Sequence, residues 1–181
     1  MNRAGTVDED ERLRLFLALE LPDDVTTALG SWNARHLEGG RPVESFHVTL
    51  AFLGSRPRSE LDSILSAVRV FAAETPPFEL RVLRYREARS VGMLVLGDES
   101  GSGTRLATGL QTRLERLGVY RRETRPWLPH VTVLRFGKRP RLDPPLPALG
   151  PFVPSGAAAF LSRLHPTGAR YEVLESFPFA Q

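Results

Sequence analysis

Alternating apolar and polar residues predict strands in this chain, and apolar residues at helical spacing predict helices. Residues 13–21 place a leucine at every second position up to Leu19, which predicts a buried strand because successive side chains of a strand point to opposite faces. Pro22 ends this strand. Two acidic residues follow it and favour the start of a helix, which we expect over residues 23–36.

The rest of the chain continues this mixture of strands and helices. A second helix begins near Ser59, with apolar residues at helical spacing (61, 64, 65, 68 and 71). Further elements are a helix at 104–117 and strands at 46–53, 78–85, 91–96 and 130–136. Residues 137–154 are rich in Pro and Gly and predict an irregular crossing segment, and residues 157–164 and 170–174 predict a closing hairpin.

Two of the predicted strands carry the same pattern of histidine, apolar residue, threonine and apolar residue. The first copy spans residues 47–50 and the second spans 130–133. In each copy the histidine and threonine share one face of the strand, about 7 Å apart at roughly 3.3 Å per residue, while the apolar pair faces the core. One copy alone is typical of an ordinary strand, since Thr and Val are favoured there. The repetition indicates a function.

The elements around each motif are repeated in the same order. A strand, a helix and a motif strand occur at 13–21, 23–36 and 46–53, and again at 91–97, 104–117 and 130–136. Two half-domains related by a pseudo-twofold axis would place the motif strands side by side, with the histidines facing each other across a groove. We therefore predict an α+β fold of two pseudo-symmetric lobes of antiparallel sheet with outer helices. Residues 1–11 are expected to form a disordered leader, and residues 12–181 a single bilobal domain.

Composition narrows the class of protein. The chain has 181 residues, 41% of them hydrophobic and 25% charged, as expected for one globular domain. It has no cysteine, which excludes disulfides, thiol nucleophiles and zinc sites built on cysteine. The N-terminal residues lack an apolar signal segment, and no apolar run approaches the length that spans a bilayer. These features predict a cytoplasmic, monomeric protein with no membrane partner.

Lys138 is the single lysine among 24 basic residues. Arginine binds phosphate with a planar fork, so this composition is compatible with an RNA or nucleotide partner, although a coding bias toward arginine would produce it too.

Paired imidazoles and hydroxyls suit chemistry at a phosphodiester. A neutral imidazole can take a proton from water, a protonated one can give a proton to a leaving oxygen, and hydroxyls can donate to the nonbridging oxygens. Two histidines on separate strands, with no carboxylate at ligand spacing, match zinc sites poorly. We therefore expect neither a metal nor a cofactor.

Residues outside the motifs carry a family resemblance. These stretches include Leu15–Pro22, Arg41-Pro42-Val43, Ala51–Gly54, Arg125–Pro129 and Gly168–Tyr171. With the two motifs about eighty residues apart, residues 12–176 resemble the 2H phosphoesterase superfamily, and within it the RNA 2',3'-cyclic phosphodiesterases, once described as 2'-5' RNA ligases. The stretch Val43–Phe46 departs from the Trp and Asn that the family often carries before the first motif.

The resemblance implies metal-independent hydrolysis of an RNA 2',3'-cyclic phosphate end to a 2'-phosphomonoester, with 2'-5' RNA ligase activity as a further expectation. It implies that His47 is the proton donor to the leaving 3' oxygen and that His130 is the proton acceptor that activates water. Thr49 and Thr132 would hold the phosphate.

The same resemblance implies two substrate contacts. Arg135 would add a charged contact and Phe52 would stack on the terminal base. Each of these residues has a structural alternative. Arg135 would be a solvated surface charge, and Phe52 would be a core residue. The two other histidines, His165 in the closing hairpin and His36 at a helix end, are expected to be a turn residue and a surface or capping residue.

Two functional alternatives stay open at this point. One is a 2H phosphoesterase acting on another small cyclic phosphate, such as a free nucleotide or an ADP-ribose derivative. The other is a module that binds RNA ends without turnover. Intact histidine and threonine in both motifs argue against the second alternative.

Overall fold

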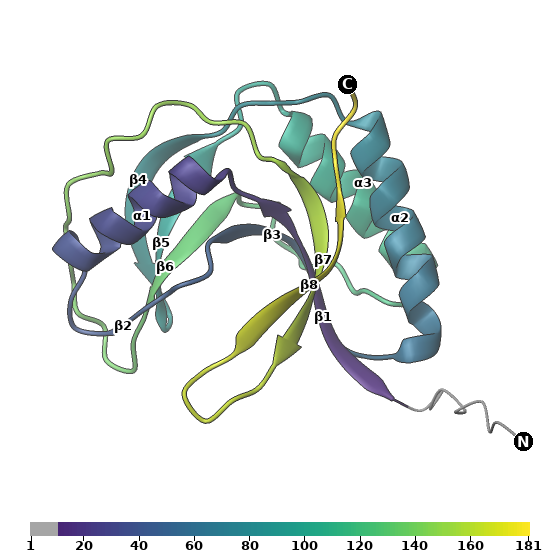
Figure 1. Ribbon diagram of the computed structural model, residues 1–181, viewed down its shortest axis with the longest axis horizontal. Coiled ribbons are helices and arrows are strands. Elements are labelled where there is room, and N and C mark those ends of the chain that lie inside the picture. Colours follow the sequence, from purple (N-terminus) through teal and green to yellow (C-terminus); the bar gives the residue numbers. More distant parts are fainter. Residues whose placement is uncertain (1–10) are drawn as a thin grey trace, which may run out of the picture.

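An antiparallel sheet of eight strands forms the centre of the fold (Figure 1). The computed structural model describes residues 11–181, so the predicted disordered leader lies almost wholly outside the described residues. The strands are β1 (Arg12–Glu20), β2 (Arg41–Pro42), β3 (His47–Pro57), β4 (Arg81–Ala88), β5 (Val91–Gly97), β6 (His130–Arg135), β7 (Gly156–Arg163) and β8 (Arg170–Phe177). Their order is β4-β5-β6-β3-β1-β7-β8, with β2 paired to β6.

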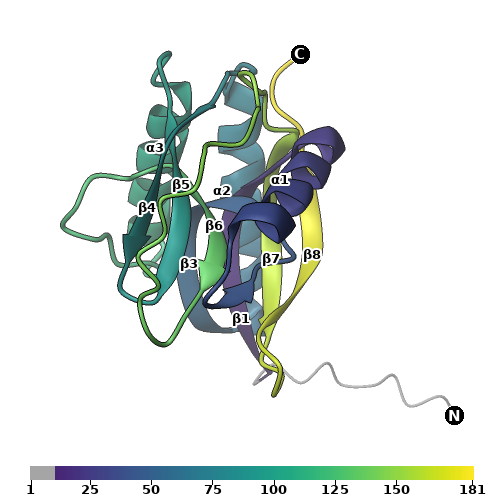
Figure 2. The same cartoon turned by 90° about the vertical axis from the view of Figure 1, so that its left-hand side faces the viewer.

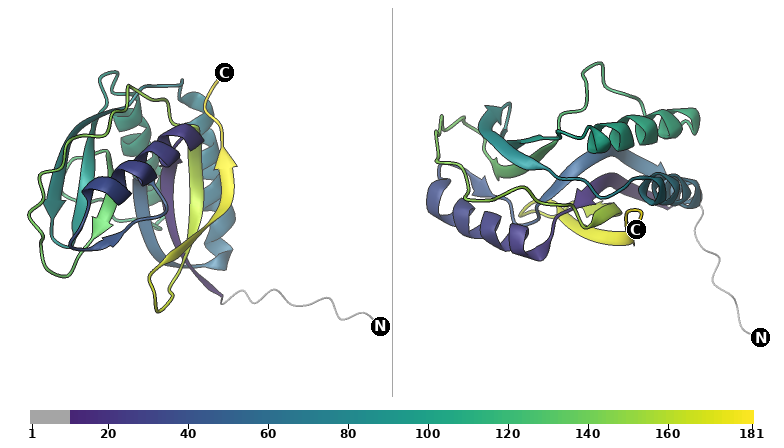
Figure 3. Two further views of the ribbon diagram at one scale, coloured as in Figure 1. Left: turned by 60° about the vertical axis from the view of Figure 1, so that its left-hand side comes forward. Right: turned by 90° about the horizontal axis from the view of Figure 1, so that it is seen from above.

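Three α-helices accompany the sheet within the described residues: α1 (Asp23–His36), α2 (Leu61–Glu74) and α3 (Ser102–Arg116). A short 3-10 turn, Arg58–Glu60, leads into α2. Helix α2 packs on α3 and against β7 and β8, while α3 also contacts β3. Helix α1 lies apart from this pair, as Figures 2 and 3 show. None of these helices has the length and apolar run that a bilayer crossing needs.

The predicted duplication is confirmed by the sheet order. Strands β3 and β6, which carry the two motifs, are neighbours at the centre of the sheet and pair through Val48 and Val131. Each is flanked on its outer side by the strand that begins its own half, β1 beside β3 and β5 beside β6. This pair of valines joins the two predicted lobes into one sheet.

Helices α1 and α3 each support the motif strand of the opposite half. Asn33 of α1 donates from Nδ2 to the carbonyl oxygen of Val133 on β6, at 2.7 Å. Gln111 of α3 donates from Nε2 to the carbonyl oxygen of Leu50 on β3, at 2.8 Å. Both carbonyls belong to the last residue of a motif, and both amide side chains are buried. These equivalent hydrogen bonds satisfy strand carbonyls that lie in the core.

Most predicted boundaries agree with the structure to within two residues. Strand β4 ends at Ala88 rather than at residue 85, and β8 ends at Phe177 rather than at residue 174. Two further differences have a physical reason. Gly54 was expected to end the first motif strand, but the strand continues to Pro57 because Gly54 takes a φ of +68° at an irregularity in the β1–β3 pairing. A glycine adopts this backbone conformation without strain. Strand β4 begins at Arg81 rather than at residue 78, since Leu80 pairs instead with Phe152 of the crossing segment.

Candidate active site

The two motifs place their polar side chains on one face of the central strand pair. Val48 and Val131 are buried in the core and lie opposite each other. Continuing this antiparallel register sets His47 opposite Thr132 and Thr49 opposite His130. Because side chains alternate along a strand, all four polar groups face away from the core that holds the valines.

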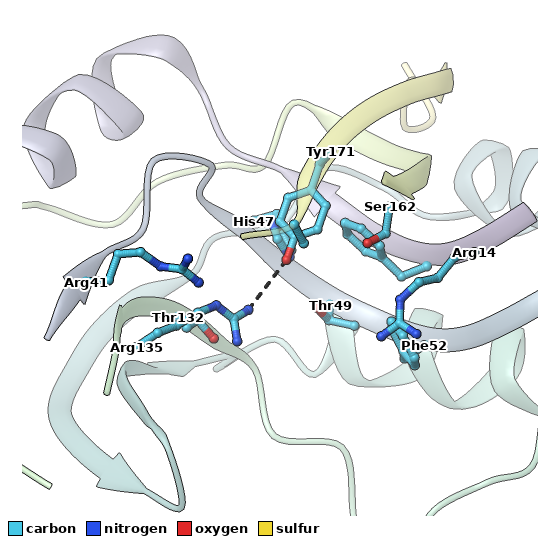
Figure 4. A pocket seen from close by; sticks show the side chains of 11 residues that line it. Arg14, Arg41, His47, Thr49, Phe52, Thr132, Arg135, Ser162 and Tyr171 are labelled. Carbon is cyan, nitrogen blue, oxygen red and sulfur yellow. Dashed lines mark hydrogen bonds between the residues drawn. The ribbon is translucent and has the colours of Figure 1, made fainter. Parts of the chain in front are cut away.

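A cavity of about 420 Å³ lies over this face (Figure 4). Of the predicted site residues, it is lined by His47, Thr49, Phe52, Thr132 and Arg135. The other lining residues are Arg14, Phe16, Arg41, Ser162, Ala169 and Tyr171. The ring of His130 is not among the lining side chains, but it is close enough to His47 that a proton on it would help to lower the pKa of that ring.

The ring of His47 packs against an aromatic wall built by the outer strands. Its centroid lies 4.9 Å from that of Phe16, 5.8 Å from that of Phe160 and 5.5 Å from that of Tyr171. These rings come from β1, β7 and β8 and cover part of the imidazole, while the rest of it lines the cavity.

Burial lowers the pKa of His47 to about 4, and the positive charge of Arg135 acts in the same direction, as does His130 when its ring carries a proton. The backbone of Ser45 raises this pKa in part, although Nδ1 of His47 has no hydrogen bond of good geometry. Without a bound anion, His47 is therefore neutral at pH 7.

His130 has a different environment on its own strand. Its Nδ1 lies 2.8 Å from the carbonyl oxygen of Leu128. A carbonyl can only accept a hydrogen bond, so Nδ1 carries the hydrogen and Nε2 of the neutral ring keeps its lone pair. The ring is partly exposed. His130 is thus oriented to accept a proton through Nε2, whereas His47 is enclosed.

Three arginines make the cavity electropositive. Arg14, Arg41 and Arg135 line it, no carboxylate does, and none of the three forms an ion pair within residues 11–181. Nη2 of Arg135 lies 3.5 Å from the hydroxyl of Tyr171 (Figure 4). Unpaired guanidinium groups around a concave site favour a phosphate ligand.

Phe52 is a surface residue, so the alternative that places it in the core is wrong. Half of its side chain is exposed (50%), and it lines the cavity. The guanidinium of Arg14 lies 4.9 Å from the centroid of the Phe52 ring. This pair offers a planar cation and an aromatic ring, both of which stack on nucleobases.

Sequence reasoning missed the aromatic wall and two of the arginines. The alternation in β1 did carry a signal, because its buried leucines leave Arg14 and Phe16 on the opposite face. Arg41 and Tyr171 lie in stretches that carry the family resemblance, but no periodic pattern placed them at the site. The two-residue strand β2 is too short for such a pattern, and β8 reaches the site only through its pairing with β7.

Within the described part of the chain, no three His, Cys, Asp or Glu side chains are grouped so as to hold a metal ion. The expectation of a metal-independent reaction stays a prediction.

The fold and the two motifs are those of a 2H phosphoesterase domain. Residues 21–172 match the 2'-5' RNA ligase superfamily. A Thermus thermophilus protein named RNA 2',3'-cyclic phosphodiesterase is 34% identical over 179 residues, covering 91% of this chain and 89% of the relative. An Escherichia coli K12 protein of the same name is 31% identical over 144 residues, covering 75% and 78%.

Solved structures agree with this assignment. The crystal structure of TT0787 from T. thermophilus superposes with a TM-score of 0.79 at 32% identity, covering 92% of this chain and 98% of that one. E. coli LigT in its apo form gives a TM-score of 0.78 at 26% identity, covering 94% and 99%. The chain belongs to the 2'-5' RNA ligase superfamily, and the predicted family and fold are confirmed.

Proposed function

We propose that this protein hydrolyses 2',3'-cyclic phosphate ends of RNA to 2'-phosphomonoesters without a metal ion. One observation carries the proposal: two histidines with different surroundings and two threonines share one face of the central strand pair, beside a cavity with three unpaired arginines. The names of the T. thermophilus and E. coli relatives support the same reaction.

The proposed reaction divides proton transfer between the histidines. Nε2 of His130 takes a proton from water while the water oxygen attacks phosphorus. The bond from phosphorus to the 3' oxygen breaks, and His47 gives its proton to that oxygen. Thr49 and Thr132 donate hydrogen bonds to the nonbridging oxygens, where negative charge accumulates. The product carries a 2'-phosphomonoester and a free 3' hydroxyl.

Two further residues would bind the substrate around the reacting phosphate. Arg135, whose charge reaches His47, contacts the phosphate or its immediate neighbour. Phe52 and the guanidinium of Arg14, which lies over its ring, bind the terminal base by stacking. The predicted cytoplasmic location and monomeric state stay predictions.

Incubation with an RNA ending in a 2',3'-cyclic phosphate, with EDTA present, tests the proposal. We expect a product with a 2'-phosphate, identified by mass and by resistance to a 3'-specific phosphatase. His47→Ala and His130→Ala should each lower turnover by about a hundred- to ten-thousandfold. His36→Ala is the matched control, because this histidine is exposed at the end of α1 and does not line the cavity. Full activity in either motif variant would remove that histidine from the mechanism.

A further inference from the structure

The cavity over the motifs continues into a second one. This neighbouring cavity has a volume of about 680 Å³ and shares Arg41, Arg135, Ala169 and Tyr171 with the first. Its other walls are residues 42–45, next to β2, and residues 167–170 of the β7–β8 hairpin. Four shared residues make the two cavities parts of one groove, which runs from the Phe52 end past the motifs and on beyond Arg135.

Two arginines lie directly opposite each other where the cavities meet. Arg41 on β2 pairs with Arg135 on β6, so their side chains leave the same face of the sheet. Like charges in this position destabilise a strand pair. Neither guanidinium forms an ion pair within the described residues. The lining of the second cavity holds one acid, Glu44, and three arginines, Arg41, Arg135 and Arg170, so its net charge is positive. A bound anion would remove the repulsion.

The hairpin holds the guanidinium of Arg41 in place. Nη1 of Arg41 donates to the carbonyl oxygen of Thr167. The adjacent Gly168 has a φ of +127°, a backbone conformation that residues with a side chain rarely adopt. Glycine is therefore favoured at this position of the hairpin tip. One donor of the arginine is fixed to the backbone, and its remaining N–H groups are free to bind a ligand.

The cyclic phosphate alone does not account for this charge. It carries one negative charge, and the proposed site already supplies two threonine hydroxyls, His47 and Arg135 for it. An RNA strand brings a second anion, the phosphate on the 5' side of its terminal nucleoside.

We propose that Arg41, beside Arg135 where the two cavities meet, binds this 5' phosphate, so that the protein selects RNA strands over free cyclic nucleotides. The inference rests on the proposed function and defines its substrate more closely.

Two substrates that differ by one phosphate test the inference. They are adenosine 2',3'-cyclic phosphate and the same nucleotide with a 5'-phosphate, both assayed in EDTA. We expect kcat/KM to be about ten- to a hundredfold higher with the 5'-phosphate, as for one or two charge-assisted hydrogen bonds. Arg41→Gln should bring this ratio close to one, and Arg41→Lys should leave an intermediate ratio because it keeps the charge but loses the planar fork.

Arg163→Gln is the matched control. Arg163 lies on the same hairpin, pairs with Glu172 and lines neither cavity, so this variant should keep the wild-type ratio. Equal kcat/KM for the two substrates in the wild-type protein would overturn the inference, and so would a ratio that survives Arg41→Gln.

Equilibrium binding of adenosine 2'-phosphate, with and without a 5'-phosphate, repeats the comparison without turnover. If the protein hydrolyses no cyclic phosphate, the proposed function is refuted. The binding comparison still tests the 5' phosphate site in that case. Equal dissociation constants for the two ligands would overturn the 5' phosphate site.

Discussion

A bound cyclic phosphate should place a proton on His47. Burial against the aromatic wall lowers the pKa of this histidine to about 4. At pH 7 its protonated form is then about 4 kcal/mol less favourable than the neutral form, at about 1.4 kcal/mol for each pH unit. The proposed proton donor therefore has almost no proton to give before the substrate binds.

The charge of the substrate supplies the missing free energy. A unit negative charge about 4 Å from the imidazolium stabilises it by about 4 kcal/mol at an effective dielectric constant of about 20. This gain is of the same size as the cost of protonation, so binding should bring the pKa of His47 close to neutral pH. His47 thus becomes an acid only in the complex, which links proton uptake to substrate binding.

Calorimetry of substrate binding tests this coupling. The His130→Ala variant should bind adenosine 2',3'-cyclic phosphate and turn it over at least about a hundredfold more slowly than the wild type, which lets binding be followed before hydrolysis. This phosphodiester does not itself titrate near pH 7. Titrations in buffers with different ionisation enthalpies give the number of protons taken up. We expect about half a proton at pH 7 and more at pH 6, by the balance of energies above.

A variant that lacks both histidines, His47→Ala with His130→Ala, is the control and should take up no proton. Binding by His130→Ala without proton uptake at both pH values would refute the reasoning. The NMR titration of the His47 ring, with and without ligand, would then show the same low pKa in both states.

The remaining predictions concern catalysis and stability. His130→Ala should lower kcat by about a hundred- to ten-thousandfold in steady-state assays, as for loss of one general base, while the melting temperature stays near that of the wild type. Because the pKa of His47 is about 4 in the folded protein and 6.5 in the unfolded chain, the unfolded chain binds more protons between these values, and the folded state loses stability as the pH falls from about 6.5 toward 4. Over this range the unfolding free energy of the wild type, measured in urea, should fall by about 3 kcal/mol more than that of His47→Gln. Glu87→Ala should cost about 2–4 kcal/mol in the same assay, because this carboxylate, only 4% exposed, accepts hydrogen bonds from two backbone N–H groups of the crossing segment, which the variant leaves without an acceptor, as well as from the exposed Arg139. Gln111→Leu should lower the unfolding free energy by about 1–3 kcal/mol, because it removes the hydrogen-bond donor to the carbonyl oxygen of Leu50 on the first motif strand. A change of less than about 0.5 kcal/mol, which is typical of surface substitutions, would show that this carbonyl needs no partner.

The structure breaks the symmetry of the two motifs. His47 and His130 occupy equivalent positions on neighbouring strands, but only His47 meets rings from the outer strands. His130 instead bonds to the carbonyl of Leu128 and remains partly exposed. One repeated sequence pattern therefore produces two imidazoles with different surroundings, and the proposed acid and base roles depend on this difference.

The sequence by itself determined the parts of the site that depend on local periodicity. A period of two placed His47 and Thr49 on one face of their strand and the core residues on the other, and the repeat placed the second motif in an equivalent strand. These features follow from backbone geometry within a few residues. The helices and the closing hairpin were predictable for the same reason.

Only the tertiary structure decided which side chains surround the motifs. The aromatic wall around His47 joins three strands that are distant in sequence, and Arg41 faces Arg135 only because the two-residue strand β2 pairs with β6. Neither arrangement has a periodic signal along the chain. Burial and the approach of like charges depend on long-range strand pairing, and they set the pKa of His47 and the charge of the groove.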